Sequence, residues 1–138
     1  MDLSLAILAD TYTPLLAISC VFILKSQFTK MRLLSLAIAF IYVTFFAFVE
    51  FHFGWWLALD ANFSSHTAIV MVMIFALLQA RFKIGVVAFT SVFAYGYLMV
   101  MLDYHSWFDI LTTILVCFPC WLLFSYLNKK TKDTSSNK

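Results

Sequence analysis

The chain has 138 residues, of which 64% are hydrophobic and 12% are charged, and its mean hydropathy is +0.95. A soluble domain of this length cannot bury so much apolar surface in its own core, so lipid must cover the remainder. This composition excludes an ordinary soluble domain and predicts an all-α, polytopic transmembrane bundle.

Five apolar stretches are separated by short polar segments, and each predicts a membrane helix. They run over residues 5–24, 33–49, 67–80, 84–102 and 107–127. A hydrocarbon core of ~30 Å needs ~20 residues at a rise of ~1.5 Å each, so the third stretch is short. We expect this helix either to begin near Phe63 or to be buried among the others. We expect one membrane domain over residues 1–127 and a disordered basic tail over 128–138.

The first stretch is expected to be a retained helix rather than a cleaved signal peptide. No basic residue precedes it, Asp10 and Pro14 lie inside it, and it ends at Lys25. A cleavable signal would have a basic start and a small-residue cleavage site after a shorter apolar run.

The charges alternate between the connections. All nine basic residues follow the first, third and fifth stretches: Lys25, Lys30, Arg32, Arg81, Lys83, Lys129, Lys130, Lys132 and Lys138. Six of the seven acids lie on the other side: Asp2, Asp10, Glu50, Asp60, Asp103 and Asp109. The positive-inside rule then predicts an outer N-terminus and a cytoplasmic C-terminus. We expect a multi-pass cell-membrane protein of the bacterial inner-membrane type, with residues 50–66 and 102–106 facing the periplasm or exterior.

His105 and Asp109 form the first candidate pair for chemistry. They are four residues apart at the start of the fifth stretch, so a helix would place them on one face. A carboxylate that holds one imidazole nitrogen leaves the other as base or nucleophile. The alternative is that Asp109 only favours the positive end of the helix dipole.

His66 lies at the start of the third stretch, where Ser64 or Ser65 can cap the helix. Free backbone N–H groups at a helix start suit a phosphate, and an adjacent histidine could donate a proton to a leaving oxygen. The alternative is an interfacial histidine beside an N-cap.

The segment Ser64-Ser65-His66-Thr67, followed by His105-x-x-x-Asp109, resembles the type 2 phosphatidic acid phosphatase superfamily, including its sphingomyelin synthase-like branch. The resemblance covers about residues 50–127. It implies His105 as a nucleophile that forms a phosphohistidine, Asp109 as its orienting partner and His66 as general acid. It further implies that Ser64, Ser65, Thr67 and His52 contact the substrate.

Three features depart from the family pattern. The lysine and arginine-proline motif that holds the phosphate is absent, Met99 stands where an arginine is expected, and Ser65 replaces a glycine. Phosphoryl transfer depends on positive charge around the transferring oxygens. Helix N–H groups and protonated histidines, with His52 as a partial substitute, would have to supply it.

Two further patterns have other interpretations. Cys117 and Cys120 form a CxxC pair, but it lies near the middle of the fifth stretch, so we interpret these residues as packing thiols beside Pro119. The acids and histidines on the outer side have metal-ligand chemistry, but their spacing matches no metal motif. A redox or metal-binding membrane protein is therefore the third interpretation, after the two functions given next.

The favoured function is that of a membrane lipid phosphatase or phospho-headgroup transferase that needs no cofactor or metal. Its expected partner is a membrane lipid with a phosphate or diphosphate headgroup, and nothing in the sequence suits nucleic acid. The alternative is a non-catalytic lipid-binding or scaffold protein on the same fold.

Overall fold

The computed structural model describes residues 3–27 and 29–136, and all regular structure in these two segments is helical. The α-helices are α1 Leu3–Leu24, α2 Lys30–Phe53, α3 Ser65–Ala80, α4 Phe82–Met101 and α5 Trp107–Ser136. Two short 3-10 helices, η1 Lys25–Gln27 and η2 Leu57–Leu59, follow α1 and α2. The predicted all-α class is confirmed.

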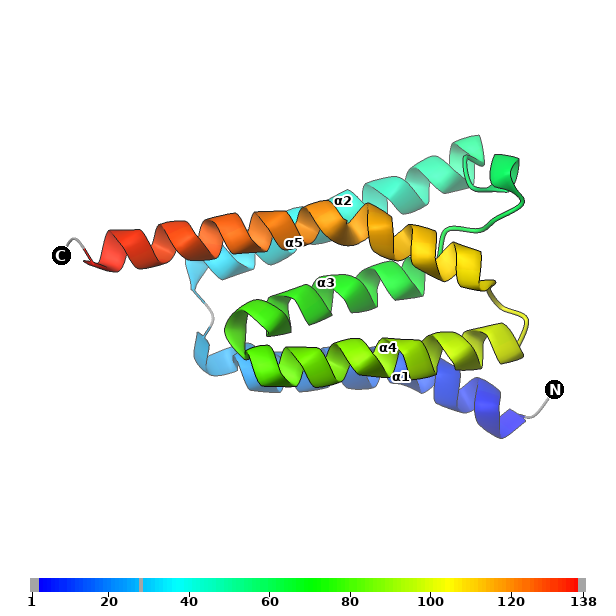
Figure 1. Ribbon diagram of the computed structural model, residues 1–138, viewed down its shortest axis with the longest axis horizontal. Helices are drawn as coiled ribbons and strands as arrows, with labels where there is room; N and C mark the ends of the chain where they lie inside the picture. The colour runs from blue at the N-terminus through cyan, green and yellow to red at the C-terminus, as the bar shows by residue number, and fades with distance from the viewer. Residues whose placement is uncertain (1–2, 28, 137–138) are drawn as a thin grey trace.

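The central helix of the bundle is α3. It packs against all four other α-helices, with α2 and α5 on one side and α1 and α4 on the other (Figure 1). Every side chain from Val70 to Leu77 is buried. Its 16 residues cover only ~24 Å at ~1.5 Å per residue. A helix shorter than the ~20 residues of a lipid-exposed span is tolerated here because protein rather than lipid covers α3. Burial among the other helices was one of our two expectations for the third stretch.

The other four α-helices present apolar side chains outward. Each contains a stretch of at least 18 residues that is long and apolar enough to cross a membrane, which in α5 lies within Trp107–Lys129. Large side chains such as Leu15 in α1, Ile41 in α2 and Leu115 in α5 are exposed. Water would not tolerate this surface, so the fold is a multi-pass helical membrane bundle.

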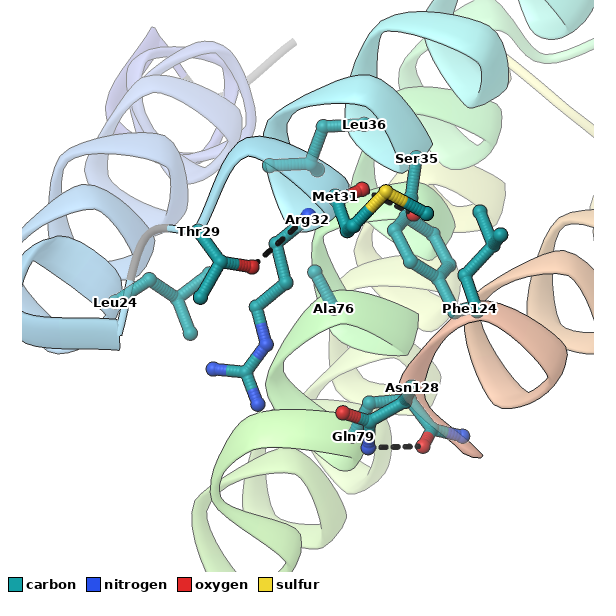
Figure 2. Close-up of a pocket in the computed structure, with 11 residues that line it drawn as sticks. Leu24, Thr29, Met31, Arg32, Ser35, Leu36, Ala76, Gln79, Phe124 and Asn128 are labelled. Atoms are coloured by element: carbon teal, nitrogen blue, oxygen red, sulfur yellow. Dashed lines mark hydrogen bonds between the residues drawn. The ribbon is translucent and has the colours of Figure 1, made fainter. Parts of the chain in front are cut away.

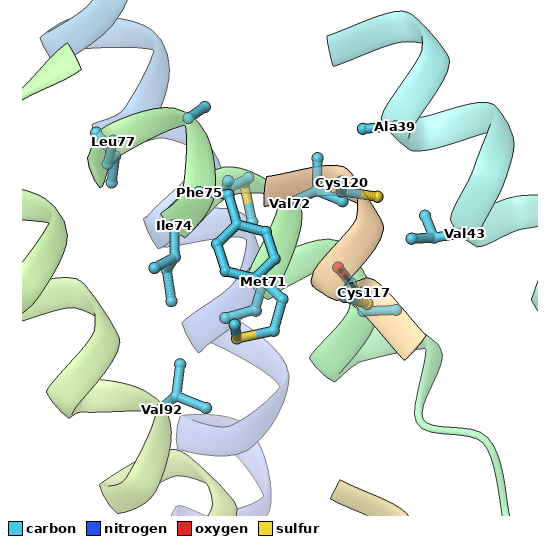
Figure 3. Packing of buried hydrophobic residues seen from close by; sticks show 14 of the residues in the cluster. Ala39, Val43, Met71, Val72, Ile74, Phe75, Leu77, Val92, Cys117 and Cys120 are labelled. Carbon is cyan, nitrogen blue, oxygen red and sulfur yellow. Dashed lines mark hydrogen bonds between the residues drawn. The ribbon is translucent and has the colours of Figure 1, made fainter. Parts of the chain in front are cut away.

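The core contains the cysteine pair of α5. Cys117 and Cys120 are buried free thiols that belong to the same apolar cluster as Val43 of α2 and Met71 of α3 (Figure 3). Pro119 between them lies inside the helix. The interpretation of the CxxC pair as packing thiols is therefore confirmed.

The connection between α3 and α4 is a single residue, Arg81. The two helices approach closely at Gly85, where an added Cβ atom would lie 2.5 Å from the Cα atom of Leu78. Only glycine allows this distance between the two backbones.

The bundle has two chemically different ends. We call the end with His52, His66 and His105, where α2 and α4 end and α3 and α5 begin, the histidine end. The opposite end, where α1 and α3 end and α2 and α4 begin, contains Arg32 and Arg81 and is called the basic end.

The helical backbone of α5 continues to Ser136, well beyond the expected end near Leu127. Helical structure thus covers most of residues 128–138, for which we expected a disordered tail, and 137–138 lie outside the described residues.

Candidate functional site

The candidate site is built on the first turns of α3 and α5, which pack against each other at the histidine end. The 11-residue segment between α2 and α3 and the short segment between α4 and α5 cover these turns. Both segments depend on hydrogen bonds from their backbone to side chains of α5.

Asp109 connects these two segments. The backbone N–H of Asn62 donates to its Oδ1 atom at 2.8 Å, and the backbone N–H of Ser106 donates to its Oδ2 atom at 2.7 Å. The N–H of Asp109 itself donates to Oγ of Ser106 at 3.1 Å. Ser106 and Asp109 therefore form a reciprocal cap at the start of α5. The buried carboxylate of Asp109 holds both the helix start and a loop residue distant in sequence.

Two threonines on the next turn of α5 complete this attachment. The backbone N–H of Ser64 donates to Oγ1 of Thr113 at 3.1 Å, and the indole N–H of Trp56 donates to Oγ1 of Thr112 at 3.0 Å. Trp56 is buried and packs against Phe63 with ring centroids 5.1 Å apart. The segment before α3 is thus fixed to α5 at three points, which positions the first turn of α3.

His105 lies directly beside this attachment. Its Nδ1 atom is 3.6 Å from Oδ2 of Asp109, which is slightly beyond hydrogen-bond distance. Within the described residues, this buried Nδ1 atom has no hydrogen-bond partner. Burial lowers the pKa of the His105 imidazole below its usual value of 6.5, and the neighbouring charge of Asp109 opposes this shift. The shift favours the neutral imidazole, which is the form that a nucleophile requires.

His66 is the second histidine of the candidate pair. It occupies the first turn of α3 with an exposed side chain. Its charge is among the causes that lower the pKa of His105, so the two imidazoles lie close enough to interact electrostatically. His66 on α3 and His105, in the segment just before α5, are thereby brought near each other, although 38 residues lie between them in the sequence.

Ser64 and Thr67 have buried side chains in this conformation. Ser64 is the N-cap of α3, its Oγ atom lies 2.8 Å from Oγ1 of Thr67, and it accepts from the backbone N–H of Thr67 at 3.4 Å. A cap role explains both residues, and their predicted contact with a substrate stays a prediction.

Ser65 and His52 line an open hollow of about 610 Å³ between the end of α2 and the start of α3. The Nδ1 atom of His52 lies 3.0 Å from the carbonyl oxygen of Phe48, and its ring packs on the Phe48 ring at a centroid distance of 3.9 Å. His66 and His105 are not among the residues that line this hollow. His52 and Ser65 thus line a hollow that is separate from the pair formed by His66 and His105.

Glu50 has a clear structural role at the same end. Its carboxylate accepts from the backbone N–H groups of Trp56 at 2.8 Å and of Leu57 at 3.2 Å. Gly54, with φ of 58°, ends α2 and donates its N–H to the Glu50 carbonyl oxygen. Glu50 therefore orders the turn that leads from α2 to η2.

Several of these positions were missed by reasoning from the sequence. The spacing of Ser106 and Asp109 is a capping-box pattern and could have been recognised. Thr112, Thr113 and Asn62 have no such signal, because their partners are distant in sequence. Trp56 also has no local signal, since it is buried whereas its neighbours Phe51, Phe53 and Trp55 are exposed.

The electrostatics of the histidine end are unusual for a phosphate site. Within residues 3–27 and 29–136, each lysine and arginine lies on the helix ends or connections of the basic end. In the same segments no three histidine, cysteine, aspartate or glutamate side chains gather in a metal-binding arrangement. Positive charge at the histidine end must therefore come from histidine protonation or helix N–H groups.

The chain was compared with protein-family models, curated proteins and solved structures, and none of them matches. The fold class, a multi-pass helical membrane bundle, rests on the structure itself. The resemblance to the type 2 phosphatidic acid phosphatase superfamily rests on the two short motifs.

Proposed function

We propose that the histidine end carries out metal-independent cleavage or transfer of a phosphate-containing lipid headgroup. The observation that carries this proposal is the position of His105. Its Nδ1 atom is directed at the carboxylate of Asp109, 3.6 Å away, while His66 lies close enough to influence its pKa. This is the arrangement expected of an oriented nucleophile beside a proton donor.

In the proposed reaction, the lone pair of the His105 Nε2 atom attacks phosphorus, and the bond between phosphorus and the leaving oxygen breaks. His66 donates a proton to that oxygen. A water molecule or a lipid hydroxyl then attacks phosphorus, the bond between phosphorus and Nε2 breaks, and the proton of the attacking group passes to His66, which restores both imidazoles to their starting forms. Hydrolysis and transfer differ only in this second acceptor.

The proposed location of this chemistry is the outer face of a cell membrane. The support is the charge distribution, since basic residues in short connections mark the cytoplasmic side. The substrate would reach the site from the outer leaflet, with its chains in lipid and its headgroup at the start of α3 and α5.

The test is phosphate release from a panel of lipid phosphates and diphosphates by purified protein in detergent with a chelator. We expect wild-type protein to release phosphate and His105→Ala to lose release by at least ~100-fold, the range for loss of a catalytic group. Asp103→Asn, an exposed position in the same loop, is the matched control and should keep wild-type release.

A second function is favoured by one specific observation. Both carboxylate oxygens of Asp109 accept backbone N–H groups, as a structural cap would, and each described lysine and arginine lies at the other end. These features favour a protein that binds a lipid headgroup without turnover. In that case no substrate of the panel releases phosphate, and His105→Ala binds lipid vesicles as wild type does.

A further inference from the structure

A partly open cavity of about 290 Å³ lies at the basic end (Figure 2), and none of the three histidines lines it. Four helices contribute to its wall: α1 through Leu24, α2 through Arg32, α3 through Ala76 and α5 through Phe124. The proposed reaction at the histidine end has no use for this cavity, so it needs an explanation of its own.

The wall combines an apolar interior with a polar edge. Leu24, Ala76 and Phe124 provide apolar surface, while Arg32 and Asn128 provide polar groups. Figure 2 shows the Arg32 side chain extending from α2 past Ala76 toward the last turn of α3. Ligand sites in proteins commonly have this composition, with a mainly apolar wall and a few polar groups that fix orientation.

The polar edge is ordered by hydrogen bonds between helices. The Gln79 amide donates to Oγ of Ser125 at 2.7 Å, and the Asn128 amide donates to Oε1 of Gln79 at 3.3 Å. These contacts fix the last turn of α3 to α5 on the side toward which Arg32 extends. The edge is therefore preorganised, which lowers the entropic cost of binding a ligand there.

The charge at this end selects the kind of ligand. Arg32 presents a planar group with five N–H donors, which suits phosphate and carboxylate oxygens. Lys25, Lys30, Arg81 and Lys129 lie on the same end of the bundle. A cluster of cations at a membrane surface attracts anionic lipids.

We propose that this cavity binds the anionic headgroup of a membrane phospholipid, with Arg32 at the phosphate and the adjoining hydrocarbon against the apolar wall. The volume of about 290 Å³ is near the lower limit of ~300 Å³ for small-molecule sites. It therefore accepts a headgroup and the start of a chain, while the rest of the lipid lies along the outer surface of the bundle.

The experiment is native mass spectrometry of purified protein in nonionic detergent, titrated with dioleoyl phosphatidylglycerol or dioleoyl phosphatidylcholine. We expect wild type to retain one phosphatidylglycerol molecule and to bind it at least ~10-fold more tightly than Arg32→Gln does, because a hydrogen-bonded charge is lost. Lys83→Gln removes the same charge at the same end but does not line the cavity, so it should bind like wild type.

Two milder variants cover the case in which Arg32→Gln does not fold. Arg32→Lys keeps the charge but loses the planar fork, and Ala76→Leu reduces the volume of the cavity; both should weaken phosphatidylglycerol binding. The proposal is wrong if neither variant binds more weakly, if phosphatidylcholine binds as tightly as phosphatidylglycerol, or if excess inorganic phosphate displaces the lipid. The last result would identify a site for the free anion.

Discussion

The two ends of the bundle are stabilised by different physical means. At the histidine end, an 11-residue connection is ordered by acidic and hydroxyl side chains that accept backbone N–H groups, with Asp109 at the centre. At the basic end, α3 and α4 are joined by one residue and their backbones approach closely at Gly85. The acids Glu50 and Asp109 near the helix ends thus order the connection between α2 and α3.

The largest expected effect of a single substitution at either end is that of Asp109→Ala. Removing the carboxylate takes away the acceptor of two part-buried N–H groups, those of Asn62 and Ser106, and a hydrogen bond to a charged group contributes about 1.5–3 kcal/mol. We expect a loss of about 2–4 kcal/mol in the free energy of unfolding, measured by denaturant titration in detergent. The matched control is Asp103→Asn, since Asn tolerates the φ of 55° found there. Equal loss in both variants would contradict the central role of Asp109.

Gly85→Ala tests the basic end in the same assay. The added Cβ atom would lie 2.5 Å from the Cα atom of Leu78, so α3 and α4 must separate. Overpacking of this kind costs about 1–3 kcal/mol. Gly96→Ala is the comparison, because its Cβ atom would meet only side-chain atoms at 3.3 Å or more. If Gly85→Ala is the more stable of the two, the close approach does not exist.

A smaller loss is expected for Glu50→Gln. The amide keeps the shape of the side chain, but only one of its two terminal atoms can accept an N–H group, so one hydrogen bond of the turn before η2 is lost. A loss of about 1 kcal/mol would be typical of one hydrogen bond. An unchanged midpoint in thermal unfolding would show that η2 needs no carboxylate.

The smallest effect is a dependence of stability on pH that belongs to the histidine end. Because burial lowers the pKa of His105 in the folded protein, the unfolded chain takes up a proton first as the pH falls through about 6.5. The free energy of unfolding should therefore be highest above this pH. It should decrease below this pH until the pH has passed the pKa of His105 in the folded protein. Thermal unfolding between pH 7.5 and 5.5 should show a flatter dependence for His105→Gln than for wild type. Equal slopes in the two proteins would contradict a contribution of His105 to the pH dependence.

Much of the fold could be predicted from the sequence because hydropathy is a local signal. The five helices lie close to the five apolar stretches, and burial among the other helices was one of the two expectations that the short third stretch raised. The cysteine pair was placed correctly because its depth in the fifth stretch follows from counting residues. The helical backbone beyond Leu127 was missed, since polar composition alone does not separate a solvated helix from a disordered tail.

The candidate site was harder to predict because its contacts are distant in sequence. The spacing of His105 and Asp109 predicted one helix face. His105 instead precedes α5, although its Nδ1 atom still lies 3.6 Å from the carboxylate of Asp109. The sequence did not indicate that Asp109 accepts a hydrogen bond from the N–H group of Asn62, 47 positions away. The buried position of Trp56 was not predictable for a related reason, since it depends on Phe63 and Thr112 rather than on its neighbours in the chain.

The central position of α3 has a consequence for biosynthesis. Two of the helices that cover it precede it in the chain and two follow it, so α3 cannot be fully enclosed until α5 has left the ribosome. Until then, its polar first turn at Ser64 and Thr67 lacks the hydroxyl of Thr113 and the surrounding helix. All contacts of α3 can therefore form only after α5 has been synthesised.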